Sequence, residues 1–170
     1  MEPKMTLNTL NIERGTIDHL EGLSVLFDRY RQFYKQPPDP DASKKFLKQR
    51  MERGESWILC AVRTAPDPPE ILGFAQMYRM FSSVSLLSGW LINDLFVSDH
   101  ARNQGIGRNL LLTVISKTRE QGNGRLWIST ERTNSRARKL YEGTGFRLDE
   151  QFNNFELTLK TGSSTQNDRE

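Results

Sequence analysis

An apolar, strand-sized run that leads through a glycine-rich loop into a helix constrains this chain more than any other feature. The run ends at Val97, and residues 102–107 of the loop read Arg-Asn-Gln-Gly-Ile-Gly. Apolar residues then recur at helical spacing from Leu110 to Ile115. Glycines at such a junction let a ligand approach the backbone, and the first helical turn offers unpaired N–H groups at the positive end of its dipole. The pattern therefore predicts an anion site of the kind that binds phosphate.

Arg102 and Arg108 flank these glycines and add positive charge to the predicted anion site. A lone Gly-x-Gly is often no more than a tight turn, and this loop matches neither common nucleotide-binding motif. The third Rossmann glycine is absent, and no lysine with a serine or threonine follows as in a P-loop. The preceding strand, the following helix and the two arginines favour the anion site over the bare turn.

The remaining sequence predicts one α/β domain of the α+β type over residues 1–160 and a polar tail over 161–170. We expect strands near residues 7–12 and at 57–63, 71–80, 86–97, 125–130, 145–148 and 152–159. We expect helices at 17–34, 42–52, 105–121 and 134–142. A meander followed by a right-handed crossover gives a mixed, mainly antiparallel sheet of six or seven strands, with about four helices on both faces.

Composition excludes several classes of protein. The mean hydropathy is −0.63 and no apolar run could span a membrane, which, with no signal-type N-terminus, predicts a soluble cytoplasmic protein. The single cysteine, Cys60, excludes an intramolecular disulfide and fits a buried, inert position. With only two histidines we expect no metal, and neither has a neighbour that indicates a triad. A net charge of +3 leaves nucleic-acid binding as a minor alternative.

A second motif lies downstream, where residues 134–146 read NSRARKLYEGTGF and predict a short helix that ends in a Gly-Phe strand entry. Together with the pattern Arg102-x-x-Gly105-x-Gly107, it resembles the two signatures of the GNAT N-acetyltransferases. The pair of motifs at this separation is far more specific than either alone. The order of predicted elements also matches that family from about residue 6 to residue 160.

The resemblance implies acetyl-CoA as cosubstrate and direct transfer of its acetyl group to a primary amine in a ternary complex. In that family the strand before the loop and the strand after its helix splay apart. The pantetheine arm then pairs with the open edge of the first strand, which also supplies an oxyanion donor. The residues that the resemblance assigns to the cofactor are Leu95, Phe96, Val97, Arg102, Asn103, Gln104, Gly105, Ile106, Gly107, Arg108, Asn134, Ala137 and Tyr141.

Two side chains are candidates for catalysis. The resemblance casts Tyr141 as the acid that protonates the departing thiolate, although a core aromatic with its hydroxyl at the rim is the alternative. The amine acceptor must also lose a proton before it attacks. The diamine and polyamine branch places a glutamate and then an aspartate on the strand before the loop, where this chain has Asn93 and Asp94. Asn93 cannot be a base, which leaves three alternatives. Asp94 removes the proton directly, a relay of waters carries it to bulk solvent, or the acceptor is of a different kind. Because strand side chains alternate, Asp94 can also face away from the site.

We expect the wall of the site that binds the amine acceptor to be formed by Phe33, Tyr34, Asn93, Thr130 and Glu131 and by the loop at 81–83. Tyr30, Phe33 and Tyr34 also fit core positions. The segment before the loop is similar to a microbial subgroup near the yeast histone, polyamine and D-amino-acid acetyltransferases. The acceptor is therefore a small amine, a polyamine, an amino acid or a protein lysine. A catalytically weak acetyl-CoA-binding regulatory protein is the alternative, supported by the departure at Asn93. Family members are often dimers, so a homodimer with an exchanged C-terminal strand is a further expectation.

Overall fold

The computed structural model describes residues 9–65, 68–122 and 124–159. Its strands form one mixed sheet in the order β1-β2-β3-β4-β5. The bounds are β1 Leu10–Arg14, β2 Ser56–Arg63, β3 Glu70–Ser82, β4 Leu87–Val97 and β5 Arg125–Ile128. Neighbouring strands from β1 to β4 are antiparallel, whereas β5 runs parallel to β4. The predicted meander and its parallel crossover strand are therefore confirmed.

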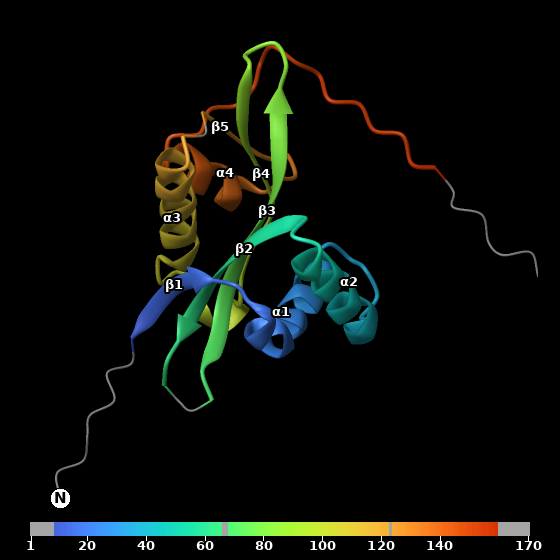
Figure 1. Cartoon of the computed structure of the whole chain (residues 1–170), viewed down its shortest axis with the longest axis vertical. Helices are drawn as coiled ribbons and strands as arrows, with labels where there is room; N and C mark the ends of the chain where they lie inside the picture. The colour runs from blue at the N-terminus through green and yellow to red at the C-terminus, as the bar shows by residue number, and fades with distance from the viewer. Residues whose placement is uncertain (1–8, 66–67, 123, 160–170) are drawn as a thin grey trace, which may run out of the picture.

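Helices cover both faces of this sheet, as Figure 1 shows. They are α1 Leu20–Phe33, preceded by the 3-10 turn Ile17–His19, α2 Pro40–Glu52, α3 Ile106–Glu120 and α4 Ser135–Glu142. An aromatic core that includes Phe27 and Phe74 lies under α1 and α2. On the other face, α3 packs on an aliphatic core that Leu140 of α4 also contacts. The four predicted helices are therefore present, with the sheet between them.

The predicted count of six or seven strands is wrong, because the described residues form five. Residues 145–148 and 152–159, which we expected to be strands, have no strand partner in the part of the chain that the structure describes. The stretch after α4 instead runs outward from the body (Figure 1), and Phe155 in it is 93% exposed. The polar tail at 161–170 lies outside the described residues, as do residues 7 and 8 of the first predicted strand.

The parallel strands β4 and β5 are paired over only part of their length. The pairing starts with Gly89 opposite Arg125 and ends with Ile92 opposite Ile128. Gly89 is required for this close approach, because a Cβ there would lie 2.0 Å from the carbonyl oxygen of Arg125. Beyond Ile92, the described chain gives β4 the strand β3 on one side and no strand on the other. The predicted splayed pair is therefore present.

A β-bulge in β4 changes the direction of the side chains that follow it. Ile92 lies opposite Met77 and Asp94 lies opposite Gln76, so Asn93 is the extra residue. Unbroken alternation would place Ile92 and Phe96 on the same face of the sheet. Instead, Ile92 belongs to the core under α3 and Phe96 to the core under α1. The bulge thus turns Asp94 and Phe96 together towards α1.

Candidate active site

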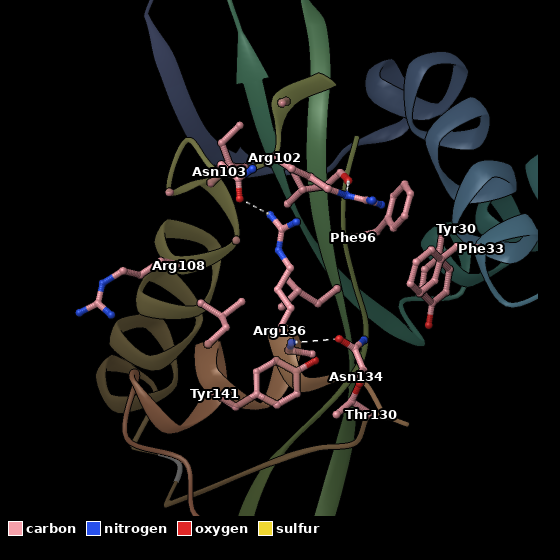
Figure 2. Close-up of a pocket in the computed structure, with 18 of the residues that line it drawn as sticks. Tyr30, Phe33, Phe96, Arg102, Asn103, Arg108, Thr130, Asn134, Arg136 and Tyr141 are labelled. Atoms are coloured by element: carbon pink, nitrogen blue, oxygen red, sulfur yellow. Dashed lines mark hydrogen bonds between the residues drawn. The ribbon is translucent and has the colours of Figure 1, made fainter. Parts of the chain in front are cut away.

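A cavity of about 290 Å³ lies where β4 and β5 separate, between α1, the N-terminus of α3 and α4 (Figure 2). Most of the predicted site residues line it. These are Phe33, Tyr34, Leu95, Phe96, Val97, Arg102, Asn103, Gly105, Ile106, Gly107, Arg108, Thr130, Asn134, Ala137 and Tyr141. Four predicted site residues lie outside the lining, namely Asn93, Asp94, Gln104 and Glu131. The two sequence motifs, distant in the chain, therefore meet at one site.

The glycine loop presents backbone N–H groups at one end of this cavity. Gly105 caps α3 with φ of 78°, and Asn103 has φ of 66°. Both values lie in the left-handed region, which glycine adopts freely and asparagine more readily than most residues. The first backbone N–H of α3 that donates to a carbonyl of the loop is that of Asn109, which lies 2.9 Å from the oxygen of Gly105. The N–H groups of residues 106–108 come before it, so they are free to bind an anion.

The guanidinium of Arg102 is held between aromatic rings at the wall of the cavity. It lies 5.4 Å from the centre of the Phe96 ring and 5.7 Å from that of Phe33. Its Nε donates a hydrogen bond to the carbonyl of Val97 at 3.2 Å, and it forms an ion pair with Asp99. These contacts fix the positive charge beside the end of β4.

Two further arginines, Arg136 and Arg108, connect the first motif to the second. Arg136, in the first turn of α4, donates from Nη2 to Oδ1 of Asn103 at 2.9 Å (Figure 2). Arg108 donates from Nη1 to the carbonyl of Gly143 at 3.0 Å. Both bonds join the loop and helix of the first motif to the second motif, so α3 and α4 are held together here. Figure 2 shows that the Arg108 guanidinium points away from the cavity.

The second motif places a capping amide and a phenol on the opposite wall. Asn134 caps α4, because its Oδ1 accepts the N–H of Ala137 at 3.0 Å (Figure 2). Asn134, Ala137 and Tyr141 all line the cavity. Burial raises the pKa of Tyr141 to about 12. The phenol therefore stays protonated at neutral pH, which an acid requires.

Asp94 is buried behind the cavity wall, on the side of α1. It is 5% exposed and accepts hydrogen bonds from Nδ2 of Asn93, at 3.0 Å, and from the hydroxyl of Tyr30. Burial raises the pKa of the Asp94 carboxyl, and these two hydrogen bonds lower it by less. Asp94 therefore does not face away from the site, but Tyr30 lies between it and the cavity.

Sequence reasoning missed four residues of the lining, which are Tyr30, Ala101, Arg136 and Leu140. Tyr30 was expected in the core more than at the acceptor site, and it does serve in the core, since its ring packs edge-on against Phe74 at 5.9 Å. The usable signal was its position three and four residues before Phe33 and Tyr34, on one helical face that ends at the proline exit. Arg136 had no signal of its own, because its role depends on how α4 packs on α3.

Tyr34 and Glu131, two of the residues expected in the acceptor wall, lie near each other. Tyr34 lines the cavity, and burial followed by the negative charge of exposed Glu131 raises the pKa of its phenol. Thr130 also lines the cavity, just after β5. Three of the five predicted acceptor residues, Phe33, Tyr34 and Thr130, thus line the cavity, whereas Asn93 and Glu131 do not. Glu131 lies near enough for its charge to act on Tyr34.

Other titratable side chains lie elsewhere. Ser98 Oγ is 2.9 Å from Nδ1 of His100, whose Nε2 is 3.0 Å from Glu70, so the expectation that no histidine joins a triad-like chain is wrong. Ser98 is 3% exposed, which keeps its hydroxyl from any substrate. Cys60 is buried as predicted, and burial raises its pKa to about 12. Among the described residues, no three potential metal ligands gather, and no helix is long and apolar enough to cross a bilayer.

A mixed sheet that opens beside a glycine loop, with a phenol facing the gap, is the architecture of an acetyltransferase. The profile of the Acetyltransferase (GNAT) family matches residues 21–146, and the chain belongs to this family. It is 37% identical over 150 residues to the uncharacterized N-acetyltransferase YhfO of Bacillus subtilis strain 168, a match that covers 88% of this chain and 98% of that protein. The protein is therefore an N-acetyltransferase enzyme, as predicted.

Two further relatives agree with this assignment. The D-amino-acid N-acetyltransferase HPA3 of Saccharomyces cerevisiae is 28% identical, over 76% of this chain and 80% of that protein. A crystal structure described as a probable acetyltransferase superposes with a TM-score of 0.82 at 39% identity, covering 89% of this chain and 99% of that one. The family and the fold are thus established by sequence and by structure.

The raised pKa of Asp94 predicts a stability gain for Asp94→Asn that depends on pH. Because the folded pKa lies above the ordinary value of 3.8, the native state binds the proton more tightly than the unfolded state, and wild-type stability falls as pH rises through this interval. Asparagine carries no charge to bury. We expect the variant to unfold at a higher denaturant concentration than wild type at pH 7, and the difference to vanish below pH 3.8.

Chemical denaturation at several pH values measures this difference, and Asp149→Asn is the matched control because Asp149 is exposed. A variant that is less stable than wild type at every pH would contradict the account of Asp94 as a costly buried charge.

Proposed function

We propose that this enzyme moves the acetyl group of acetyl-CoA to a primary amine by direct attack in a ternary complex. The acceptor is a small amine, a polyamine, an amino acid or a protein lysine. One observation carries the proposal: the open edge of β4 and the free N–H groups at the start of α3 line the same cavity. A ligand with a peptide-like arm and a phosphate end, which acetyl-CoA has, satisfies both sets of groups at once.

The residues of the loop fit the phosphate end of the cosubstrate that the family uses. Residues 106–108 offer backbone N–H groups, and the side chains of Arg102 and Arg136 add positive charge on the cavity side. Arg108 lines the same end, although its guanidinium bonds Gly143. Gly105 leaves open space, since a Cβ there would meet no atom within 4 Å. Gln104 is exposed beside the loop and donates to the carbonyl of His100 at 3.3 Å. We therefore assign the loop to the pyrophosphate and the adenosine phosphates.

We assign the open edge of β4 and the phenol of Tyr141 to the thioester end of acetyl-CoA. Backbone groups of Leu95, Phe96 and Val97 would hold the pantetheine arm, and a backbone N–H there would stabilise negative charge on the thioester oxygen. The amine nitrogen attacks the carbonyl carbon, and the carbon–sulfur bond breaks. Tyr141 then gives its phenolic proton to the departing sulfur, because a pKa of about 12 keeps that proton in place until a thiolate forms.

The acceptor side of the cavity suits a cationic amine. Phe33 and Tyr34 provide aromatic faces, which attract ammonium groups. The carboxylate of Glu131 acts on Tyr34 from the rim, and Thr130 supplies a hydroxyl. Asn93, exposed at the bulge, adds an amide near the same end of β4. These groups support an amine acceptor and leave each of the four acceptor kinds to be tested.

The pair Gly105→Asp and Gly105→Asn tests the cosubstrate assignment. Both side chains tolerate the left-handed backbone of Gly105 and have open space, so folding is affected alike. Only aspartate brings a negative charge to the phosphate site. Repulsion of about 1–4 kcal/mol predicts a rise of about fivefold or more in the KM for acetyl-CoA, beyond the small effect expected for asparagine. The measurement is release of free thiol from acetyl-CoA with polyamines, amino acids, aminoglycosides and histone peptides.

Equal effects of the two substitutions would contradict the placement of phosphate at this loop. If wild type binds acetyl-CoA tightly but releases no thiol with any amine, and Tyr141→Phe leaves binding unchanged, the regulatory acetyl-CoA-binding protein is the correct description instead.

We also propose that two copies of the chain pair through residues 152–159. This segment carries apolar side chains on alternate positions, and Phe155, Leu157 and Leu159 are 93%, 82% and 75% exposed. The outer edge of β5 carries no strand among the described residues, and Arg125 at its start is exposed. A strand of a second copy would satisfy that edge, cover these apolar side chains and bring exposed Glu156 towards the arginine.

The double substitution Phe155→Asp with Leu157→Asp should therefore shift the protein from dimer to monomer. Light scattering on the full chain measures the mass, which is 19.7 kDa for one copy. The control is Val25→Asp, since Val25 is 53% exposed on α1, and it should leave the dimer intact. A monomeric wild type, or a dimer that survives the double substitution, would contradict this interface.

A further inference from the structure

We propose that Tyr30 is a further catalytic residue, which passes the proton of the acceptor ammonium to Asp94. The inference rests on the proposed acetyl transfer and concerns how the acceptor becomes a nucleophile. It starts from the positions of three groups. The cavity is lined by Tyr30 but not by Asp94, and the two are joined by a hydrogen bond in which the phenol donates to the carboxylate.

Asp94 cannot meet an acceptor directly. It is 5% exposed, and its carboxylate is occupied by the hydroxyl of Tyr30 and by Nδ2 of Asn93. A proton can reach the carboxylate from the cavity through the Tyr30 hydroxyl, which both lines the cavity and bonds the carboxylate. A buried carboxylate behind a phenol that lines a cavity is the arrangement of a relayed base.

The phenol is held where the relay requires it. Its ring packs edge-on against Phe74 at 5.9 Å and against Tyr34 at 5.2 Å, and it contacts Phe96 at 5.8 Å. These contacts come from the residue that follows α1, from β3 and from β4, so the ring cannot turn its hydroxyl away from Asp94 without disturbing the aromatic core. The bulge at Asn93 completes the geometry, because it turns Asp94 towards α1.

Asp94 is the buried carboxylate on this route, whereas the other carboxylate near the cavity, Glu131, is exposed at the rim and acts on Tyr34. The titratable groups that face Asp94 are Tyr30 and Tyr34 from α1 and Tyr78 from β3, and Tyr141 from α4 faces Tyr30. All four are phenols whose pKa is raised first by burial, and the negative charge of Asp94 raises the pKa of Tyr30, Tyr34 and Tyr78 further. A neutral phenol can take one proton on its oxygen while it gives up another.

The proton balance is complete without any other reactant. The ammonium nitrogen gives one proton to the oxygen of Tyr30 as the Tyr30 hydroxyl gives its own to the Asp94 carboxylate, and the phenol is neutral before and after. The free amine then attacks the thioester carbon. Its second proton replaces the one that Tyr141 delivers to the leaving sulfur. After product release, Asp94 returns its proton through Tyr30 to water.

The test is the pH profile of kcat/KM for Tyr30→Phe, followed by thiol release. At pH 7 the amine is protonated, and loss of the relay should lower kcat/KM on the order of 100-fold. Above the pKa of the amine no relay is needed, so the loss should disappear. Asp94→Asn should show the same profile, and the double variant should be no worse than either single one, because the two residues act as a unit.

The matched control is Tyr78→Phe. It removes a phenolic hydroxyl on the same face, bonded to Nε2 of Gln76 at 2.7 Å, and Tyr78 does not line the cavity. This variant should lose stability and keep the wild-type pH profile. A loss in Tyr30→Phe that is equal at every pH would show a packing role and overturn the relay. Full activity of Tyr30→Phe at pH 7 would also overturn it, since Asp94 would then act through another route.

A second readout does not need turnover. Carbon-13 NMR of the carboxyl group should show that the pKa of Asp94 rises further in Tyr30→Phe, because the hydrogen bond from the phenol favours the carboxylate. An unchanged pKa would overturn the proposed link between the two groups. A wild type that releases no thiol with any amine would instead refute the acetyl transfer itself, and the relay with it.

Discussion

The site depends on the point where β4 stops pairing with β5. The last paired residues are Ile92 and Ile128, and Gly89 brings the two backbones together just before. Past this point, the backbone of Asn93–Val97 has an open side, and unpaired backbone groups are costly to bury without a partner. A ligand that supplies peptide-like hydrogen bonds takes the place of the missing strand. The cavity, the glycine loop and α4 are all arranged around that gap.

A single extra residue in the same strand, Asn93, also determines the direction in which the Asp94 side chain points. The bulge at Asn93 moves Asp94 from the α3 side of the sheet to the α1 side, where Tyr30 bonds it. A buried carboxylate is costly for folding, and the enzyme retains it where a proton acceptor is useful. In the proposed mechanism, Asp94 therefore serves as the base despite the departure from the diamine branch at Asn93. The amide of Asn93 instead bonds the carboxylate that follows it.

The sequence predicted what depends on local spacing. The loop at residues 102–107 was predicted because its glycines and arginines lie between a strand and a helix, and the structure adds that Gly105 is a left-handed N-cap. The second helix was predicted from the motif at 134–146, and the structure adds that Asn134 caps it. The contact of Tyr30 with Asp94 was not predictable, since a bulge changes the side-chain alternation and depends on pairing with β3. Residues 152–159 have the alternation of a strand, but alternation cannot supply a partner edge. The sequence therefore predicts where helices and strands lie in the chain more reliably than it predicts which strands pair.

The central claim is that the open edge of β4 and the start of α3 bind one ligand together. Amide hydrogen exchange on the full chain, with and without acetyl-CoA, tests it most directly. We predict slower exchange in residues 95–97 and in residues 103–108 when the cosubstrate is present, while β1 stays unchanged. Binding of acetyl-CoA that leaves exchange in both segments unaltered would contradict the account.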